Sequence, residues 1–206
     1  MREISDSLPI CFYENPKGES ASRRTKPRFQ TIMRVGRITL DDDQGLARVK
    51  NVSDNGAHLH VSIPLRLRVA VTLELAEGEA LLGQVVWVAD DECGIRFDQQ
   101  IDCAALLRRL AQSTLNGVTR SLRLQTSKPA VIRSERGVRL AKVQDISQRG
   151  MKLLHDGSLT ENMAVKITLP SGLERCGIVR WSRDNIAGVL LLQPFCTEEL
   201  GWSRAL

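Results

Sequence analysis

The chain has 206 residues, a net charge of +5 and a hydrophobic fraction of 42%, and no stretch of it approaches the roughly 18 apolar residues that a membrane-spanning helix needs. Its five cysteines are odd in number and contain no Cys-x-x-Cys pair, which argues against both a disulfide framework and a zinc site. The composition therefore predicts a soluble, cytoplasmic protein that is not inserted in a membrane.

The first 22 residues lack periodicity and are rich in serine, proline, glycine and charge, which is typical of a flexible arm. Their apolar run, Leu8 to Tyr13, is too short for a secretory signal. From Lys17 to Arg37 the chain holds seven basic residues and one acidic residue. Because this excess is local, it indicates a local anionic ligand, whereas a nucleic-acid-binding protein usually spreads positive charge along a face or a helix.

Arginines mark the centre of this basic segment, at Arg23, Arg24 and Arg28. Pro27 disfavours a helix, so we expect a constrained loop that enters a strand at Phe29. A guanidinium can bind a phosphate or a guanine edge through two hydrogen bonds, which an ammonium cannot do. A solvated loop without a ligand is the ordinary alternative for a basic run.

A series of short strands follows the loop. Apolar and polar residues alternate, the period of a half-buried strand, in Ala57 to Val61, Val69 to Leu75 and Cys93 to Phe97. Turn signals separate the strands at Asp41 to Gly45, Asp54 to Gly56, Ala76 to Glu79 and Asp90 to Glu92. Since no helix-length segment interrupts them, the pattern predicts a small antiparallel barrel.

One of these strands carries side chains suited to a ligand. In Asn51-x-Ser53-x-x-Gly56 the spacing places the amide of Asn51 and the hydroxyl of Ser53 on one face of the strand. Gly56 permits a turn or a close approach to a ligand. Asn55-Gly56 is also a strong hairpin signal, which explains the glycine without any ligand.

The segment from Gln99 to Leu115 breaks the strand period. Its apolar residues fall at i, i+3, i+4 and i+7, which is typical of an amphipathic helix, at Cys103, Leu106, Leu107 and Leu110. Asn116-Gly117 can end this helix and lead into the second half of the chain.

The second half repeats the first with a constant offset of 94 residues. Asn51 to Gly56 recurs as Asp145-Ile146-Ser147-Gln148-Arg149-Gly150, and Trp87 recurs as Trp181. A repeat of this size without an insertion favours two domains of about 90 residues. The basic loop precedes the first copy only, because the same offset places Val118 and Leu122 at the positions of Arg24 and Arg28.

These motifs together resemble the PilZ domain, the bacterial receptor module for the second messenger cyclic di-GMP. The family's signature is Arg-x-x-x-Arg on an N-terminal loop, followed by Asp/Asn-x-Ser-x-x-Gly on a barrel strand. Arg24 to Arg28 and Asn51 to Gly56 match the two parts in order, and Gly83 to Phe97 is similar to the family's closing strands. The resemblance implies an all-β protein, with at most one short helix per domain, made of two tandem PilZ-like six-stranded antiparallel β-barrels.

The resemblance also implies a domain plan and a ligand site. The chain would consist of a flexible arm at 1–22, a ligand-binding PilZ domain at 23–115 and a PilZ-like domain without the arginine motif at 116–206. Arg24 and Arg28 would bind the phosphates and guanine edges of cyclic di-GMP. Asn51 and Ser53 would contact the base, and Gly56 would leave room for it. Arg23 would occupy the position thought in this family to influence whether one nucleotide or an intercalated pair is bound.

The second copy matches the family in part. Asp145, Ser147 and Gly150 fit the strand motif, but no Arg-x-x-x-Arg precedes them, since Arg120 and Arg123 are only three residues apart. The family pattern then implies that this copy either does not bind the nucleotide or offers a weak second site at Asp145, Ser147 and Gly150.

Other residues suggest neither a metal nor catalysis. His58 and His60 share a strand face but have no third ligand near in sequence, so we expect satisfied or exposed histidines and no metal. Trp87 and Trp181 are expected to pack in the core or at a rim rather than stack on bases. The sequence contains no Gly-x-Ser-x-Gly motif, no P-loop and no dinucleotide fingerprint, so we expect no enzyme.

The sequence thus predicts a non-enzymatic cyclic di-GMP receptor with no cofactor besides this ligand. The ligand would order the arm and the arginine loop against the first barrel and so change a surface shown to the second domain or to an unidentified protein partner. Two alternatives remain open. An interaction adaptor with the same fold would not bind the nucleotide, and a nucleic-acid-binding protein would use the basic arm with a steep salt dependence.

Overall fold

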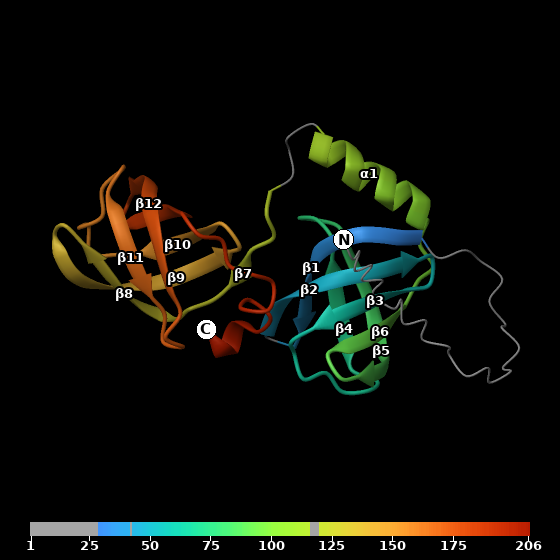
Figure 1. Ribbon diagram of the computed structural model, residues 1–206. Coiled ribbons are helices and arrows are strands. Elements are labelled where there is room, and N and C mark those ends of the chain that lie inside the picture. The colour runs from blue at the N-terminus through green and yellow to red at the C-terminus, as the bar shows by residue number, and fades with distance from the viewer. Residues whose placement is uncertain (1–28, 42, 116–119) are drawn as a thin grey trace, which may run out of the picture.

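The computed structural model describes residues 29–41, 43–115 and 120–206. The arm at 1–22, the arginine loop with Arg23, Arg24 and Arg28, and Asn116-Gly117 lie outside these residues. The described chain folds into two β-barrels that lie side by side (Figure 1).

Six antiparallel strands close the first barrel, with the neighbour order β1-β2-β3-β6-β5-β4. The strands are β1 (Phe29–Leu40), β2 (Asp43–Ser53), β3 (Gly56–Val61), β4 (Ala70–Glu74), β5 (Ala80–Ala89) and β6 (Glu92–Phe97). The helix α1 (Cys103–Leu115) follows β6. The sequence-based prediction of a small antiparallel barrel followed by a helix is confirmed.

The second barrel repeats the first strand by strand. It is built from β8 (Pro129–Ser134), β9 (Gly137–Ser147), β10 (Gly150–Leu154), β11 (Ala164–Thr168), β12 (Glu174–Arg183) and β13 (Ile186–Leu191). The pairing of β9 with both β8 and β10 closes the ring, and the two-residue strand β7 (Leu124–Gln125) adds to β9. Two tandem six-stranded antiparallel barrels are therefore present, as the sequence predicts.

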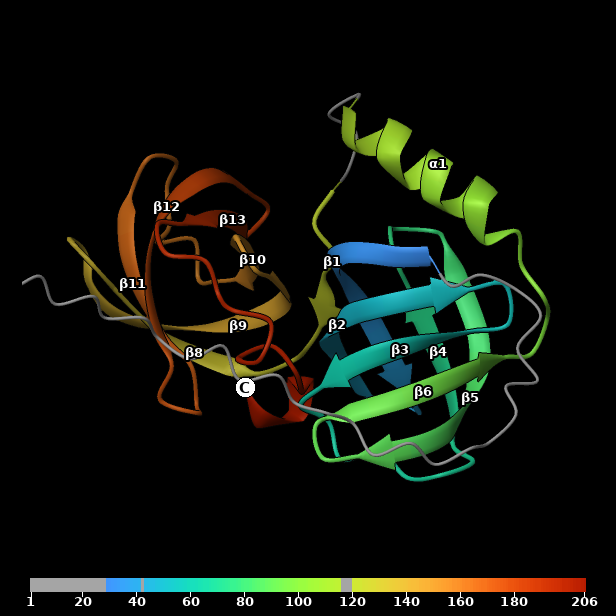
Figure 2. The same cartoon turned by 45° about the vertical axis from the view of Figure 1, so that its right-hand side comes forward.

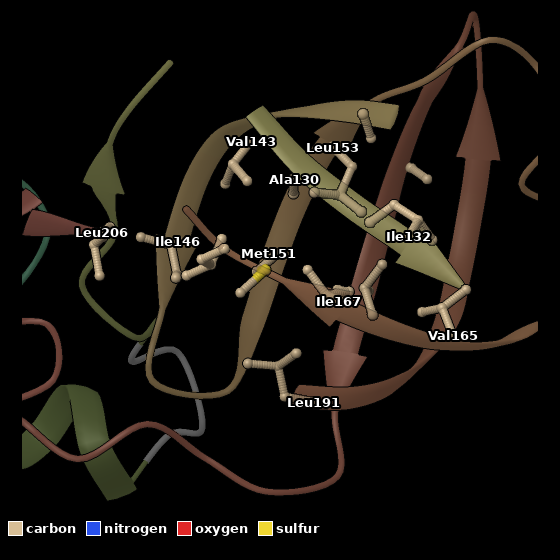
Figure 3. Close-up of a cluster of buried hydrophobic side chains, with 14 of the residues drawn as sticks. Ala130, Ile132, Val143, Ile146, Met151, Leu153, Val165, Ile167, Leu191 and Leu206 are labelled. Carbon is tan, nitrogen blue, oxygen red and sulfur yellow. The ribbon is translucent and has the colours of Figure 1, made fainter. Parts of the chain in front are cut away.

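Each barrel encloses its own apolar core, because alternate residues of every strand point inward. In the first barrel Leu59 and Leu73 are fully buried. In the second barrel Ile132, Leu153 and Ile167 point into the ring from β8, β10 and β11 (Figure 3).

Helix α1 packs its apolar side on the core of the first barrel through Cys103, Leu106 and Leu110. The carboxylate of Asp102 caps the helix by accepting a hydrogen bond from the backbone N–H of Ala105 at 2.8 Å. No helix within the described ranges is both long and apolar enough to cross a membrane.

The start of β2 corrects one expectation. The sequence predicts a turn over Asp41 to Gly45, but β2 already begins at Asp43, whose side chain is buried. The reason is tertiary: the Ser203 hydroxyl donates a hydrogen bond to the Asp43 carboxylate, and the Arg204 guanidinium lies 3.3 Å from its second oxygen. The predicted turn is thus present at Asp41, and contacts with a segment far away in the sequence shorten it at Asp43.

The outer side of β2 forms the junction between the barrels, where β7 and the C-terminal segment lie (Figure 2). The Leu46 side chain belongs to the core of the second barrel, and its backbone N–H donates to the carbonyl of Leu200 at 2.8 Å. In the opposite direction, Trp202 packs against the core of the first barrel. A Cβ on Gly45 would overlap the carbonyl oxygen of Gly201, so this close approach requires glycine.

Candidate functional site

The strand motif lies on the outer face of the first barrel. Val52 and Ala57 point into the core, so their neighbours point outward. Across the strands, Asn51 is opposite His58, His58 is opposite Gly94, and Gly94 is opposite Trp87. One row of residues therefore crosses β2, β3, β6 and β5, and its third position, Gly94, has no side chain.

A β-bulge sets the direction of this motif. The register between β2 and β3 shifts between Val49 and Asn51, so Lys50 is an extra residue. Val49 and Val52 both stay buried, and Asn51 and Ser53 are both half-buried on the outer face. Bulges commonly redirect side chains in this way next to functional sites. The expectation that Asn51 and Ser53 share a face is confirmed.

Asn51, Ser53 and Gly56 line one pocket with a volume of about 450 Å³. This volume lies within the range of small-molecule sites. Arg96 also lines the pocket, directly opposite Gly56 across β3 and β6. Within the described residues the pocket thus combines an amide, a hydroxyl and a guanidinium, which are suited to a polar or anionic ligand.

Hydrogen bonds and close backbone packing fix the turn of the strand motif. Ser53 donates its hydroxyl hydrogen to the carbonyl of Gly56 at 3.1 Å, and a Cβ on Gly56 would overlap the carbonyl oxygen of Ile95. The carboxylate of Asp54 accepts a hydrogen bond from the backbone N–H of Cys103 at 3.3 Å. The turn is therefore attached to the first residue of α1, which fixes one wall of the pocket.

His58 and Trp87 form the opposite wall. Their ring centres are 5.1 Å apart in an edge-to-face arrangement with an interplanar angle of 61°, above Gly94. Glu92 accepts a hydrogen bond from Lys50 and lies 2.6 Å from His58 Nε2, and these contacts with Lys50 and His58 lower the pKa of its carboxyl group. His58 is thus a satisfied histidine, as expected.

Sequence reasoning missed three residues that line this pocket, His58, Trp87 and Arg96. Trp87 keeps 38% of its surface exposed and lies at the rim, one of the two places expected for it. The signal that could have found it is Gly94: a glycine opposite a tryptophan on the next strand leaves room for the ring to lie across the sheet.

The second barrel carries the corresponding pocket, with a volume of about 600 Å³. Its row runs from Asp145 through Lys152 and Gly188 to Trp181. Ser147 donates to the carbonyl of Gly150 at 3.2 Å, as Ser53 does to Gly56. Asp145, Ser147 and Gly150 therefore lie together, and Arg123 forms an ion pair with Asp145.

No group of three or more histidine, cysteine, aspartate or glutamate side chains within residues 29–41, 43–115 and 120–206 could hold a metal ion. Burial raises the pKa of the Cys93 thiol to about 12, so this cysteine stays protonated at neutral pH.

Residues 22–113 match the model of the PilZ domain family. This segment is a PilZ domain. The match spans all six strands of the first barrel and most of α1, and it includes both the arginine loop and the strand motif. The family resemblance stated from the sequence is thus confirmed for the first copy.

The similar solved structures have low sequence identity to this chain. The PlzA protein of Borreliella burgdorferi in complex with c-di-GMP is 10% identical, with a TM-score of 0.38, over 79% of this chain and 83% of that one. The Bacillus subtilis inhibitor of motility, MotI/DgrA, is 12% identical, with a TM-score of 0.32, over 82% and 94%. YcgR from Escherichia coli in complex with c-di-GMP is 10% identical, with a TM-score of 0.28, over 78% and 75%. None of the curated proteins matches the sequence.

Proposed function

We propose that this chain is a non-enzymatic cyclic di-GMP receptor that binds the dinucleotide in the pocket of its PilZ domain. The observation that carries the proposal is the convergence of Asn51, Ser53 and Gly56 on one outward-facing pocket, next to the strand into which the arginine loop leads. We assign ligand binding to Arg23, Arg24, Arg28, Asn51, Ser53 and Gly56. The domain plan is the one implied by the sequence, with the arm at 1–22 and the domains at 23–115 and 116–206.

The chain connectivity supports a site shared by the arginine loop and the strand motif. Phe29 in β1 is opposite Val52, and Gln30 is opposite Asn51. Arg28 directly precedes Phe29 in the sequence, and Arg24 lies five residues before it. At no more than about 3.6 Å per residue, Arg24 is within roughly 18 Å of the start of β1. Both arginines are thus within reach of the pocket beside β2.

The chemistry of the pocket suits this ligand. Cyclic di-GMP presents two phosphates and two guanine bases. Guanidinium groups bind phosphates and the O6/N7 edge of guanine through paired hydrogen bonds and also stack on flat rings. Asn51 supplies both a donor and an acceptor for a base edge. Gly56 lets β3 approach β6 closely beside the pocket, because a Cβ at this position would overlap the carbonyl oxygen of Ile95.

The signal would be transmitted by ordering of the arm and the arginine loop on ligand binding. A glycine-, serine- and charge-rich segment has too few apolar groups to pack by itself, and a dianionic ligand between the arginine loop and the barrel supplies the missing interaction. The ordered loop then changes the surface presented to the second barrel or to a protein partner.

Calorimetric titration of the full chain with cyclic di-GMP, with an unrelated cyclic dinucleotide as control, tests the proposal. We expect saturable binding of cyclic di-GMP and much weaker binding of the control. Absence of binding would instead favour the interaction adaptor. Tighter, steeply salt-dependent binding of duplex DNA would favour a nucleic-acid-binding protein that uses the basic arm.

The serines of the two motifs provide a matched pair of variants. Ser53 and Ser147 make the same turn hydrogen bond, at 3.1 and 3.2 Å, so alanine removes the same internal contact from each barrel. We expect Ser53→Ala to weaken cyclic di-GMP binding by roughly 2- to 12-fold, the range for one hydrogen bond, and Ser147→Ala to leave the affinity unchanged. Calorimetry on both variants measures the difference. Equal losses would show that the second barrel takes part in binding this ligand.

Limited proteolysis measures the proposed ordering. We expect peptide bonds between Lys17 and Arg28 to be cleaved readily in the free protein and to be protected by saturating cyclic di-GMP. Bonds at Asn116-Gly117 serve as the internal control, because the ligand is not expected to protect them. If the arm is cleaved at the same rate with and without bound ligand, ordering is not the mechanism, even where calorimetry demonstrates binding.

A further inference from the structure

We propose that the second barrel holds a binding site of its own for a small phosphate-bearing ligand with a flat ring, such as a nucleotide, in the pocket beside Trp181. This site is independent of the one assigned to the PilZ domain. Three of its four basic residues, Lys152, Arg180 and Arg149, have no lysine or arginine counterpart in the first barrel, so it does not follow from the repeated motif.

Cations reach this pocket from separate elements. Lys152 comes from β10, Arg180 from β12 and Arg149 from the turn between β9 and β10. Arg120 enters from the segment before β7. At the offset of 94 residues, the first barrel has His58, Val86 and Asn55 in place of Lys152, Arg180 and Arg149. The fold therefore gathers positive charge here that no local run of the sequence reveals.

These four cations, unlike Arg123, form no ion pair or side-chain hydrogen bond with any other described residue. Asp145 is the one acid that lines the pocket, and Arg123 already neutralises it. Like charges gathered around one pocket repel each other and destabilise the folded state. An uncompensated cluster in a recess therefore points to an anion that completes it, with phosphate as the group that several guanidinium and ammonium donors bind best.

The geometry of the recess favours a ligand with a ring. Arg180 is the extra residue of a bulge in β12, next to Trp181. The Trp181 indole lies over Gly188, keeps 40% of its surface exposed and is separated from Lys152 by this glycine alone within the sheet. A flat ring can stack on the Trp181 indole while its phosphate contacts Lys152 and Arg180. Lys152 pairs with Gly188, which also pairs with Trp181, and Arg180 directly precedes Trp181.

The shape of the recess favours a small molecule over a nucleic-acid strand. Its volume of about 600 Å³ matches small-molecule sites. Apolar side chains line the pocket beside the cations, namely Met151, Val189 and Leu190, and Leu190 keeps 43% of its surface exposed.

Calorimetry with GDP, pyrophosphate and guanosine on the full chain tests this site. We expect GDP to bind more tightly than pyrophosphate, because it adds a ring, and guanosine to bind least. The double variant Lys152→Ala/Arg180→Ala should weaken GDP binding at least about tenfold. The matched control Lys142→Ala/Arg183→Ala removes the same charges from exposed positions outside the pocket and should change GDP affinity less than twofold.

A third variant separates this site from the proposed cyclic di-GMP site. Asn51→Ala/Ser53→Ala should leave GDP binding intact, whereas cyclic di-GMP binding falls. Thermal melting checks that each variant is folded. Three outcomes would each overturn the proposal. The first two are equal GDP affinity in the Lys152/Arg180 variant and the wild type, and no GDP binding at millimolar concentration. The third is displacement of GDP by a 20-base-pair DNA duplex at lower concentration than by pyrophosphate.

Discussion

Replacement of Arg24 or Arg28 by alanine is expected to weaken cyclic di-GMP binding by about 5- to 150-fold, which corresponds to about 1–3 kcal/mol. Each guanidinium would supply a charge-assisted contact that is made only with ligand. The thermal midpoint of the free protein should therefore stay unchanged. Calorimetric titration of each variant gives the affinity, and thermal unfolding without ligand gives the stability.

Arg66→Ala is the matched control for these variants. Arg66 is an exposed arginine of the same barrel that does not line the pocket, so its replacement removes the same charge from the domain. We expect its affinity to remain within twofold of the wild type. Unchanged affinity in both Arg24→Ala and Arg28→Ala would remove the arginine loop from the site. A loss in Arg66→Ala as large as theirs would mean that overall charge, not contact, governs binding.

Leu46→Ala is expected to lower the free energy of unfolding by about 2–5 kcal/mol, the usual effect of leucine truncation in a closed core. Leu46 is a residue of the first barrel, but its side chain points away from that barrel's core. It is only 2% exposed, because it packs in the core of the second barrel. Alanine would leave a cavity at the junction. Urea unfolding, followed by circular dichroism, measures the change.

Leu82→Ala provides the comparison, since Leu82 lies on β5 of the same barrel and keeps 61% of its surface exposed. Its free energy of unfolding should change by less than about 0.5 kcal/mol. If the two leucine variants are equally stable, Leu46 does not connect the cores. If Leu46→Ala also splits one calorimetric transition into two, the barrels unfold together in the wild type because of this junction.

Much of the fold could be predicted from the sequence because the chain contains the same pattern twice. The bounds of β2, β4, β5 and β6 recur in β9, β11, β12 and β13 at the same offset of 94 residues. The alternation of Ala57, Leu59 and Val61 identified β3 because every second residue is buried. The spacing of Cys103, Leu106 and Leu110 identified α1 for the same physical reason, with a helical period.

The parts that could not be predicted depend on contacts between distant segments. Period-two reasoning places Leu46 on the solvent side of β2, and it cannot indicate that the second barrel covers this side. Aspartate is a residue type that favours turns, and the burial of Asp43 depends on Ser203 and Arg204. Lys152 and Arg180 are separated by 28 positions in the sequence, and the closure of the barrel brings them to one pocket. The roles of Arg23, Arg24 and Arg28 stay predictions.

The junction on β2 has a consequence for how the protein is made. A ribosome produces β2 roughly 150 residues before Leu200, Gly201 and Trp202, and at about 5–20 residues per second this interval lasts on the order of 10 s. During that time the first barrel can close, but the outer side of β2 still exposes Leu46 and the Asp43 carboxylate without its contacts to Ser203 and Arg204. The nascent first barrel therefore exposes an apolar side chain that is buried in the finished protein, and it acquires its final surface only when the last segment of the second barrel has been made.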